Sequence, residues 1–347
     1  MPLCLKCGAD LPVDDEGGAP VLCDRCAGRA TSRARLRLNA GALMGSPATT
    51  FLIAINTAVF IGMVFSGGNP LSFSPDITLR WGANSGAYTF SGDYWRLVTA
   101  GFVHAGFFHF AINMWCLWSL GQLSERLFGS AATLAIYVLT GVGGAMLSIG
   151  VNPLRSEVGA SAAVFGIAGA ILSGIKFGNV ALASVHKRQI LSSLIFFVIF
   201  NLSFGMLPGI DNLAHLGGLV SGFLFGAPLA SAASSGKKNL EWGAIVLATV
   251  VLIGIGSRLV QSHGHLSQLR VGFYKIQERN YSGAASILQR AVSSSPNDPT
   301  AHALLGIAYE KNHQQDMANA EFQLGQQLDP DFADTKQRLE QQLGSAD

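Results

Sequence analysis

The scarcity of charge through the middle of the chain limits its fold more than any other feature. Only eight Asp, Glu, Lys or Arg residues lie between Leu97 and Gly236, and 13% of the whole chain is charged, about half the usual share. A water-soluble domain of that size needs far more charge on its surface. The sequence therefore predicts an integral multi-pass membrane protein.

Seven apolar stretches are long enough to cross a hydrocarbon core, which takes about 20 helical residues. The first begins too far into the chain to be a cleaved signal peptide. The fourth and sixth stretches are unusually rich in Gly and Ala. We therefore expect an all-α membrane protein with seven spans. Their approximate ranges are 49–66, 97–119, 131–150, 160–176, 189–207, 212–231 and 241–259.

Lys and Arg residues concentrate in alternate loops, and such residues favour the cytoplasmic side. This pattern predicts a cytoplasmic N-terminus, and an odd number of spans places the C-terminus outside the cytoplasm. The net charge of +2 follows this topology rather than a binding patch, so no nucleic-acid partner is expected. The residues on the predicted cytoplasmic side are Arg29, Arg33, Arg35, Arg37, Arg126, Lys187, Arg188, Lys237 and Lys238.

Two Cys-x2-Cys pairs lie near the N-terminus, with 15 residues between the pairs. Cys4 and Cys7 form one pair and Cys23 and Cys26 the other. Disulfides are the alternative, but a reducing cytoplasm disfavours them. The spacing therefore predicts a zinc-ribbon-like site in which four thiolates hold a structural Zn²⁺. Four protein ligands leave no open position for catalysis, so no catalytic cofactor is expected.

Residues 267–343 are soluble in character and repeat with a period of 34 residues. The period and the small residues resemble the tetratricopeptide repeat, whose usual role is to bind protein segments. The resemblance implies helical hairpins with a protein partner, and a simple helical spacer is the alternative. The matched pairs are Gly272 with Gly306, Ala284 with Ala318, Leu288 with Phe322, and Pro296 with Pro330.

Four polar residues inside the spans are candidates for chemistry, because polar groups there are costly. His109 and Asn113 share one face of span two, Ser161 opens span four, and His215 lies near one end of span six. By the predicted topology all four come from the outer half of the membrane. Gly and Ala at four-residue intervals along spans four and six form small-residue stripes, which permit close packing of the two helices.

These groups suit acyl transfer. An imidazole can activate a serine hydroxyl, and positioned donors can hold the oxyanion. No Asp or Glu is placed to orient His215, so the candidate is a dyad of Ser161 and His215. Two other interpretations remain open. In one, Ser161 is a packing residue; in the other, His104, His109 and His215 bind a metal ion.

Five ordered motifs resemble the rhomboid family of intramembrane serine proteases, from about residue 80 to 226. The resemblance implies a six-helix core at 49–232 and one extra transmembrane helix at 233–260. Residues 1–28 and 29–48 would then be a zinc-ribbon-like segment and a basic linker. The motifs are GAN (82–84), YWRLVTAGFVHAGFFHFAINMW (94–115), SERLFGS (124–130), VGASAAVFGIAGA (158–170) and NLAHLGGLVSG (212–222).

Carried over residue by residue, the resemblance makes Ser161 the nucleophile and His215 its base. It makes His109, Asn113 and Gly159 the oxyanion and substrate-binding residues. It also implies structural roles for Trp95, Arg96 and Glu125, and places Phe165 beneath the imidazole. One departure is Ala162, which stands where the family commonly has glycine.

The resemblance implies an endopeptidase in the membrane, with single-span membrane proteins as substrates and lipid as its surroundings. We expect a bacterial plasma membrane as the location. The alternative is an inactive rhomboid-like scaffold that binds membrane proteins. Ala162 and the two appended modules favour that alternative, whereas the intact polar positions favour the protease.

Overall fold

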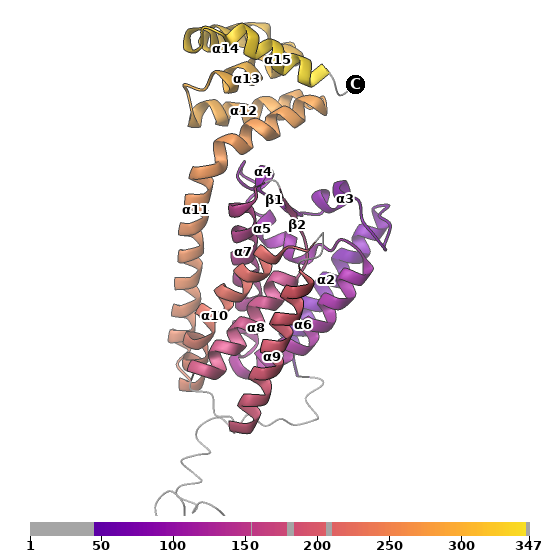
Figure 1. The fold of residues 1–347 in the computed structure, drawn as a ribbon, viewed down its shortest axis with the longest axis vertical. Helices are drawn as coiled ribbons and strands as arrows, with labels where there is room; N and C mark the ends of the chain where they lie inside the picture. The colour runs from indigo at the N-terminus through magenta and orange to yellow at the C-terminus, as the bar shows by residue number, and fades with distance from the viewer. Residues whose placement is uncertain (1–44, 154, 179–183, 206–209, 345–347) are drawn as a thin grey trace, which may run out of the picture.

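The computed structural model describes residues 45–153, 155–178, 184–205 and 210–344. The predicted zinc ligands Cys4, Cys7, Cys23 and Cys26 lie outside these residues, as does most of the predicted basic linker. The described chain is almost entirely helical, with one two-stranded sheet. Figure 1 shows a bundle of long helices, with a smaller helical group above one end.

A helix occupies each of the seven predicted spans. Within the described residues, four helices are long and apolar enough to cross a membrane, or five if a bent pair counts as one span. Helix α8 is shorter, at 17 residues, and it lies against α10 and α7 at the centre of the bundle. The helices are α2 (Pro47–Phe65), α6 (Phe107–Phe128), α7 (Ser130–Val151), α8 (Ser161–Phe177), α9 (Ser184–Phe204), α10 (Asn212–Ser235) and α11 (Lys238–Gln277).

The second span differs from the single helix predicted over 97–119. The chain there forms α5 (Arg96–Thr99) and η2 (Ala100–Phe102), and after an extended turn α6 leaves at an angle of 93°. The turn is held by a neighbouring segment: the Phe73 N–H donates to Ala105 O at 2.8 Å, and the Phe107 N–H donates to Pro70 O at 2.8 Å. These bonds satisfy backbone groups that a continuous helix would have satisfied internally.

The segment between α2 and α6 also pairs with the segment before α8. Strand β1 (Asn84–Ser85) runs antiparallel to β2 (Ser156–Glu157), with Asn84 opposite Glu157. Short helices α3 (Pro75–Arg80) and α4 (Gly86–Thr89) flank β1. This pairing fixes the chain four residues before Ser161.

The C-terminal part begins without a break. We expected the seventh span to end near residue 260 and the repeats to start at 267, but α11 is one helix of 40 residues, about 60 Å long at 1.5 Å per residue. No Pro interrupts it, and its last turns pack on α12 and α13. The helices that follow are α12 (Tyr281–Ser294), α13 (Pro299–Lys311), α14 (Gln315–Leu328) and α15 (Phe332–Gly344).

The 34-residue period is visible in the packing of these helices. A Cβ on Gly272 would lie 2.4 Å from the Leu288 side chain, and a Cβ on Gly306 would lie 2.3 Å from the Phe322 ring. Gly306 and Phe322 are the 34-residue counterparts of the first two. Each glycine therefore lets the large side chain of the next helix approach its backbone.

The C-terminal module, residues 267–344, lies above the end of the bundle that carries α4, β1 and β2 (Figure 1). Just before it, the His263 ring stacks on Phe90, with centroids 5.2 Å apart. Within it, Arg290 Nη2 donates to Ser91 O at 2.9 Å. The module therefore rests on the segment that leads away from β1.

Candidate active site

Ser161 is the first residue of α8 and is half-buried. Gly159, two residues earlier, has a φ of +116°, and its N–H donates to Ala100 O at 2.9 Å. A Cβ at Gly159 would meet the His109 ring at 2.6 Å. Both the backbone conformation and the closeness of the imidazole therefore require glycine at this position.

His215 lies in the first turns of α10 and is 7% exposed. Its ring stacks on Phe165, with centroids 4.4 Å apart and planes 9° from parallel. Phe165 stands one turn after Ser161 on α8, so it shares a helical face with the serine. His215 therefore covers the face of α8 that carries Ser161.

The buried ring nitrogen of His215 bears on its role as a base. Its Nδ1 atom is buried and has no hydrogen-bond partner among the described residues. No hydrogen bond between the Ser161 and His215 side chains is present in that same set. Catalytic hydrogen bonds are often long before substrate binds, so the stacking on Phe165 is the observation that relates the two residues.

The small-residue stripes on α8 and α10 face each other. At three successive turns, a glycine of α10 lies so close to an α8 carbonyl oxygen that an added Cβ would overlap it. This contact brings the helices of Ser161 and His215 together over most of the length of α8. The pairs are Gly218 with Ala162, Gly222 with Gly166, and Gly226 with Ala170.

Ala162, the departure from the family pattern, has its methyl group toward α7. It is 3% exposed, and a Cβ added to Gly144 would lie 2.7 Å from its own Cβ. Gly144 therefore leaves the space that the Ala162 methyl group fills.

His109 and Asn113 lie on one face of α6, in its first two turns. Asn113 is buried, and its Nδ2 donates to His109 O at 2.8 Å. His109 Nδ1 accepts from the Ala105 N–H at 3.4 Å, and its ring lies against Gly159. The structure thus brings His109 to the turn before Ser161, while the described bonds of Asn113 are to its own helix.

His104 belongs to this group, although only a metal-ligand role was considered for it. It is fully buried, its Nε2 accepts from the Ala160 N–H at 3.5 Å, and its ring meets His109 edge-on at 5.2 Å. Within the described ranges, no set of three His, Cys, Asp or Glu side chains could hold a metal ion. The position of His104 next to Ala160 instead suggests that it supports the turn before Ser161.

Glu125 is one of the residues for which the family resemblance implies a structural role, and it binds segments that surround the site. The Glu125 carboxylate accepts hydrogen bonds from the Ala48 N–H, from the N–H and hydroxyl of Thr49, and from the Ser130 hydroxyl. These bonds join the start of α2 to the junction of α6 and α7. Local sequence does not reveal this role, because two of the partners, Ala48 and Thr49, are distant from Glu125 along the chain.

Arg96 organises the segment before the bend. Its Nη1 donates to Leu79 O at 2.8 Å and to Ala83 O at 3.1 Å, and its Nε pairs with Asp93 at 3.0 Å. The guanidinium also lies 4.5 Å from the centroid of the Trp95 ring. A charged residue is thus buried with three hydrogen bonds from its guanidinium.

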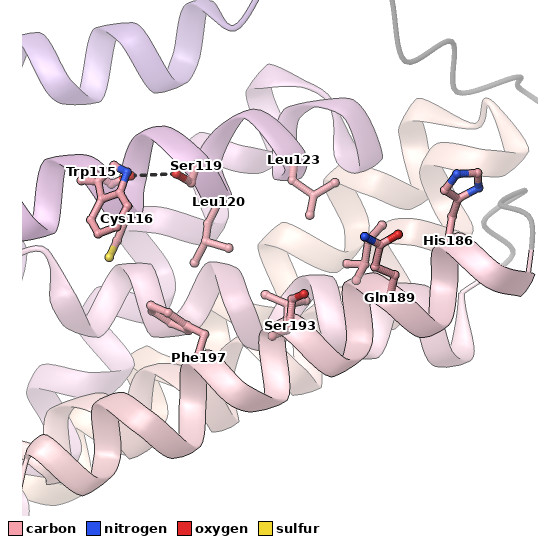
Figure 2. A pocket seen from close by; sticks show the side chains of 11 residues that line it. Trp115, Cys116, Ser119, Leu120, Leu123, His186, Gln189, Ser193 and Phe197 are labelled. Atoms are coloured by element: carbon pink, nitrogen blue, oxygen red, sulfur yellow. Dashed lines mark hydrogen bonds between the residues drawn. The ribbon is translucent and has the colours of Figure 1, made fainter.

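An apolar groove lies between α6 and α9, with a volume of about 550 Å³. Figure 2 shows side chains from both helices around it, among them Trp115 and Phe197. Cys116 is half-buried and contributes to this lining. Phe197 also contacts Phe165, with centroids 5.6 Å apart. The groove therefore reaches the aromatic group on which His215 stacks.

We predicted that no Asp or Glu is placed to orient His215, yet Asp211 lies four residues before it. It precedes α10 and caps it, as its Oδ1 accepts from the Leu213 and Ala214 N–H groups at 3.1 Å each. Asp followed by an apolar helix is a recognisable N-cap signal. Its carboxylate also binds Ser148 and Arg155, which are distant from Asp211 along the chain.

Part of the sequence, including the residues of this site, resembles known proteins. Residues 91–232 match the Rhomboid domain. Rhomboid protease GluP of Bacillus subtilis is 32% identical over 310 residues, which cover 77% of this chain and 59% of that protein. RHOMBOID-like protein 1 of Arabidopsis thaliana is 42% identical over 134 residues, 39% of this chain and 34% of that protein. The chain therefore spans little more than half of one of these relatives and a third of the other.

A shorter relative is matched over most of its length. The rhomboid protein YdcA of Bacillus subtilis is 31% identical over 179 residues, which cover 51% of this chain and 86% of that protein. The matched domain includes Ser161, His215 and the bend before α6. The chain is a multi-pass membrane protein that belongs to the rhomboid family.

Proposed function

We propose that the protein is an intramembrane serine endopeptidase with Ser161 as nucleophile and His215 as general base. The observation that carries this proposal is the stacking of His215 on Phe165, one turn from Ser161, between the closely packed helices α8 and α10. Membership of a family that includes GluP, named as a rhomboid protease, supports the same chemistry.

The proposed reaction has two halves. Ser161 Oγ forms a bond to the carbonyl carbon of the substrate peptide as its proton passes to His215. The C–N bond then breaks, and His215 gives that proton to the leaving amine. Water repeats the sequence on the acyl-enzyme, with its proton passing through His215 to Ser161 Oγ, and releases the new carboxyl end.

The oxyanion of each tetrahedral intermediate needs donors that are already in place. We assign this role to the Ser161 backbone N–H, as the first N–H of α8 has no partner within its own helix. His109 and Asn113 supply the side-chain donors, and Gly159 allows the substrate to come close. His109 is already adjacent to Gly159, and Asn113 keeps a second N–H available beside the one it gives to His109 O.

The substrates in this proposal are single-span membrane proteins, cut near the outer leaflet. The groove between α6 and α9 offers an apolar path toward Phe165 and His215 for a substrate segment that has begun to unwind. With the N-terminus in the cytoplasm, Ser161 and the C-terminal module lie on the extracytoplasmic side.

The proposal also covers the C-terminal module and the N-terminal cysteine-containing segment. We assign the C-terminal module to the tetratricopeptide type, with a protein partner, because its packing repeats with the 34-residue period. We assign a structural Zn²⁺ to Cys4, Cys7, Cys23 and Cys26. Metal analysis of purified protein tests the second assignment: about one zinc per chain is expected, and none after all four cysteines are changed to serine.

The test of the protease is labelling of purified protein by a serine-directed fluorophosphonate, together with cleavage of a model transmembrane substrate. Wild type is expected to label and to cleave, and Ser161→Ala to do neither. Ser173→Ala is the matched control, since Ser173 lies on the same helix and is buried, and it should label as wild type does. If the wild-type protein neither labels nor cleaves, the protease proposal is wrong and the alternative function, a scaffold that binds membrane proteins, is favoured.

A further inference from the structure

Asp211 stands one turn before His215. Its carbonyl oxygen accepts from the His215 N–H at 3.1 Å, and its Oδ1 holds two further N–H groups of that turn. Asp211 is the N-cap of α10 and has non-helical backbone angles, φ −97° and ψ 87°. The carboxylate and the imidazole therefore belong to the same end of α10, about one helical turn apart.

The second carboxylate oxygen of Asp211 binds two other segments. Ser148, from α7, donates its hydroxyl at 2.5 Å. Arg155 places its Nε at 3.4 Å, and its Nη2 donates to Ile210 O at 2.5 Å. Arg155 lies six residues before Ser161. A single carboxylate thus joins the helix of His215 to α7 and to the segment that leads into Ser161.

Glu157 is the other acidic residue of this region, and its environment differs. Burial raises the pKa of Glu157 to about 7, and the negative charge of Asp211 adds a smaller effect of the same sign. Glu157 Oε2 also accepts from Asn84 Nδ2 at 3.1 Å. Asp211 lies beside the Arg155 guanidinium, and its side chain is 12% exposed.

We propose that Asp211 is a positioning residue for His215, and that its negative charge stabilises the imidazolium formed when His215 takes the proton of Ser161. This inference rests on the proposed protease function. The carboxylate holds the first turn of α10 in place, and its charge acts across that turn. Arg155 partly neutralises it, so the expected effect on rate is moderate.

The experiment separates the charge of Asp211 from its capping role. Asn caps a helix about as well as Asp, so Asp211→Asn keeps the cap and removes the charge, while Asp211→Glu restores a carboxylate. Asp298→Asn is the matched control, because Asp298 caps α13 and also pairs with a histidine, His265, at 2.6 Å. Fluorophosphonate labelling, kcat and KM for a transmembrane substrate, and the thermal midpoint in detergent are measured for each.

We expect Asp211→Asn to lower the labelling rate and kcat about tenfold, less than the loss of a direct acid–base group, with KM close to wild type and a thermal midpoint lowered moderately, because the amide nitrogen cannot accept from Ser148 and Arg155. Asp211→Glu should recover much of the loss, and Asp298→Asn should lose nothing. Wild-type labelling by Asp211→Asn overturns the inference. The inference is also overturned if Asp211→Asn lowers both the labelling rate and the thermal midpoint and Asp211→Glu does not restore the rate. If the wild-type protein does not label, the proposed protease function itself is refuted, and this outcome is distinct from those that refute the role of Asp211.

Discussion

Replacement of Gly222 by Ala probes the contact that brings Ser161 and His215 together. A Cβ on Gly222 would lie 1.9 Å from the backbone oxygen of Gly166, where ordinary contacts begin at 3.4 Å. A backbone oxygen inside a helix cannot rotate away, so α8 and α10 must separate locally by about 1.5 Å, a shift comparable to the small misplacements known to impair catalysis.

The magnitude follows from that separation. Overpacking of a close interface costs about 1–3 kcal/mol, and a misplacement of about 1 Å at a catalytic site can lower the rate about 100-fold. Helix propensity alone predicts the opposite sign, since Ala is favoured over Gly by about 1 kcal/mol. Gly222→Ala is therefore expected to lower both the stability and the labelling rate.

The matched control is Gly254→Ala on α11, where an added Cβ has no atom within 4 Å. It should leave labelling unchanged and raise the thermal midpoint slightly. Both variants are measured in detergent by the midpoint of unfolding and by the rate of fluorophosphonate labelling. If Gly222→Ala labels within about twofold of wild type at an unchanged midpoint, the close approach of the two helices does not position the site.

Ala162→Gly should keep the labelling rate and cost about 1 kcal/mol in unfolding; a large gain in rate would instead mean that the methyl group crowds the oxyanion. Glu125→Gln should cost about 3 kcal/mol, because an amide can accept only part of the four hydrogen bonds, and an unchanged midpoint would contradict this. Burial raises the pKa of Glu157 from 4.5 to about 7. The folded state then binds the proton more tightly, so stability should fall as pH rises through that interval, and Glu157→Gln should remove the dependence. Arg290→Ala removes the hydrogen bond to Ser91 O, so amide exchange over residues 84–91 should become faster, whereas equal exchange would mean that the C-terminal module does not restrain this segment.

The positions of the helices were largely predictable because their cause is local. An apolar stretch of bilayer length must be helical, since lipid offers no partners for backbone groups. The facing stripes of α8 and α10 were predictable for a similar reason: small residues at four-residue intervals mark the side on which another helix can approach. The candidate chemistry followed from polar residue types in an apolar setting.

The bend before α6 and the continuity of α11 were not predictable from local pattern. The bend depends on Pro70 and Phe73, whose backbone groups pair with the extended turn from more than 30 residues away along the chain. The length of α11 depends on the helices that pack against its last turns, which the fall in hydropathy near residue 260 does not reveal.

The sequence by itself determined that this chain crosses the membrane several times, and it predicted Ser161, His215 and His109 in the same half of the membrane. Only the tertiary structure decided that Ala162 turns its methyl group into space left by Gly144, and that Asp211 joins the helix of His215 to the approach to Ser161. Periodicity and composition act within a helix, whereas these contacts depend on distances between helices. Such distances are set by how whole surfaces pack.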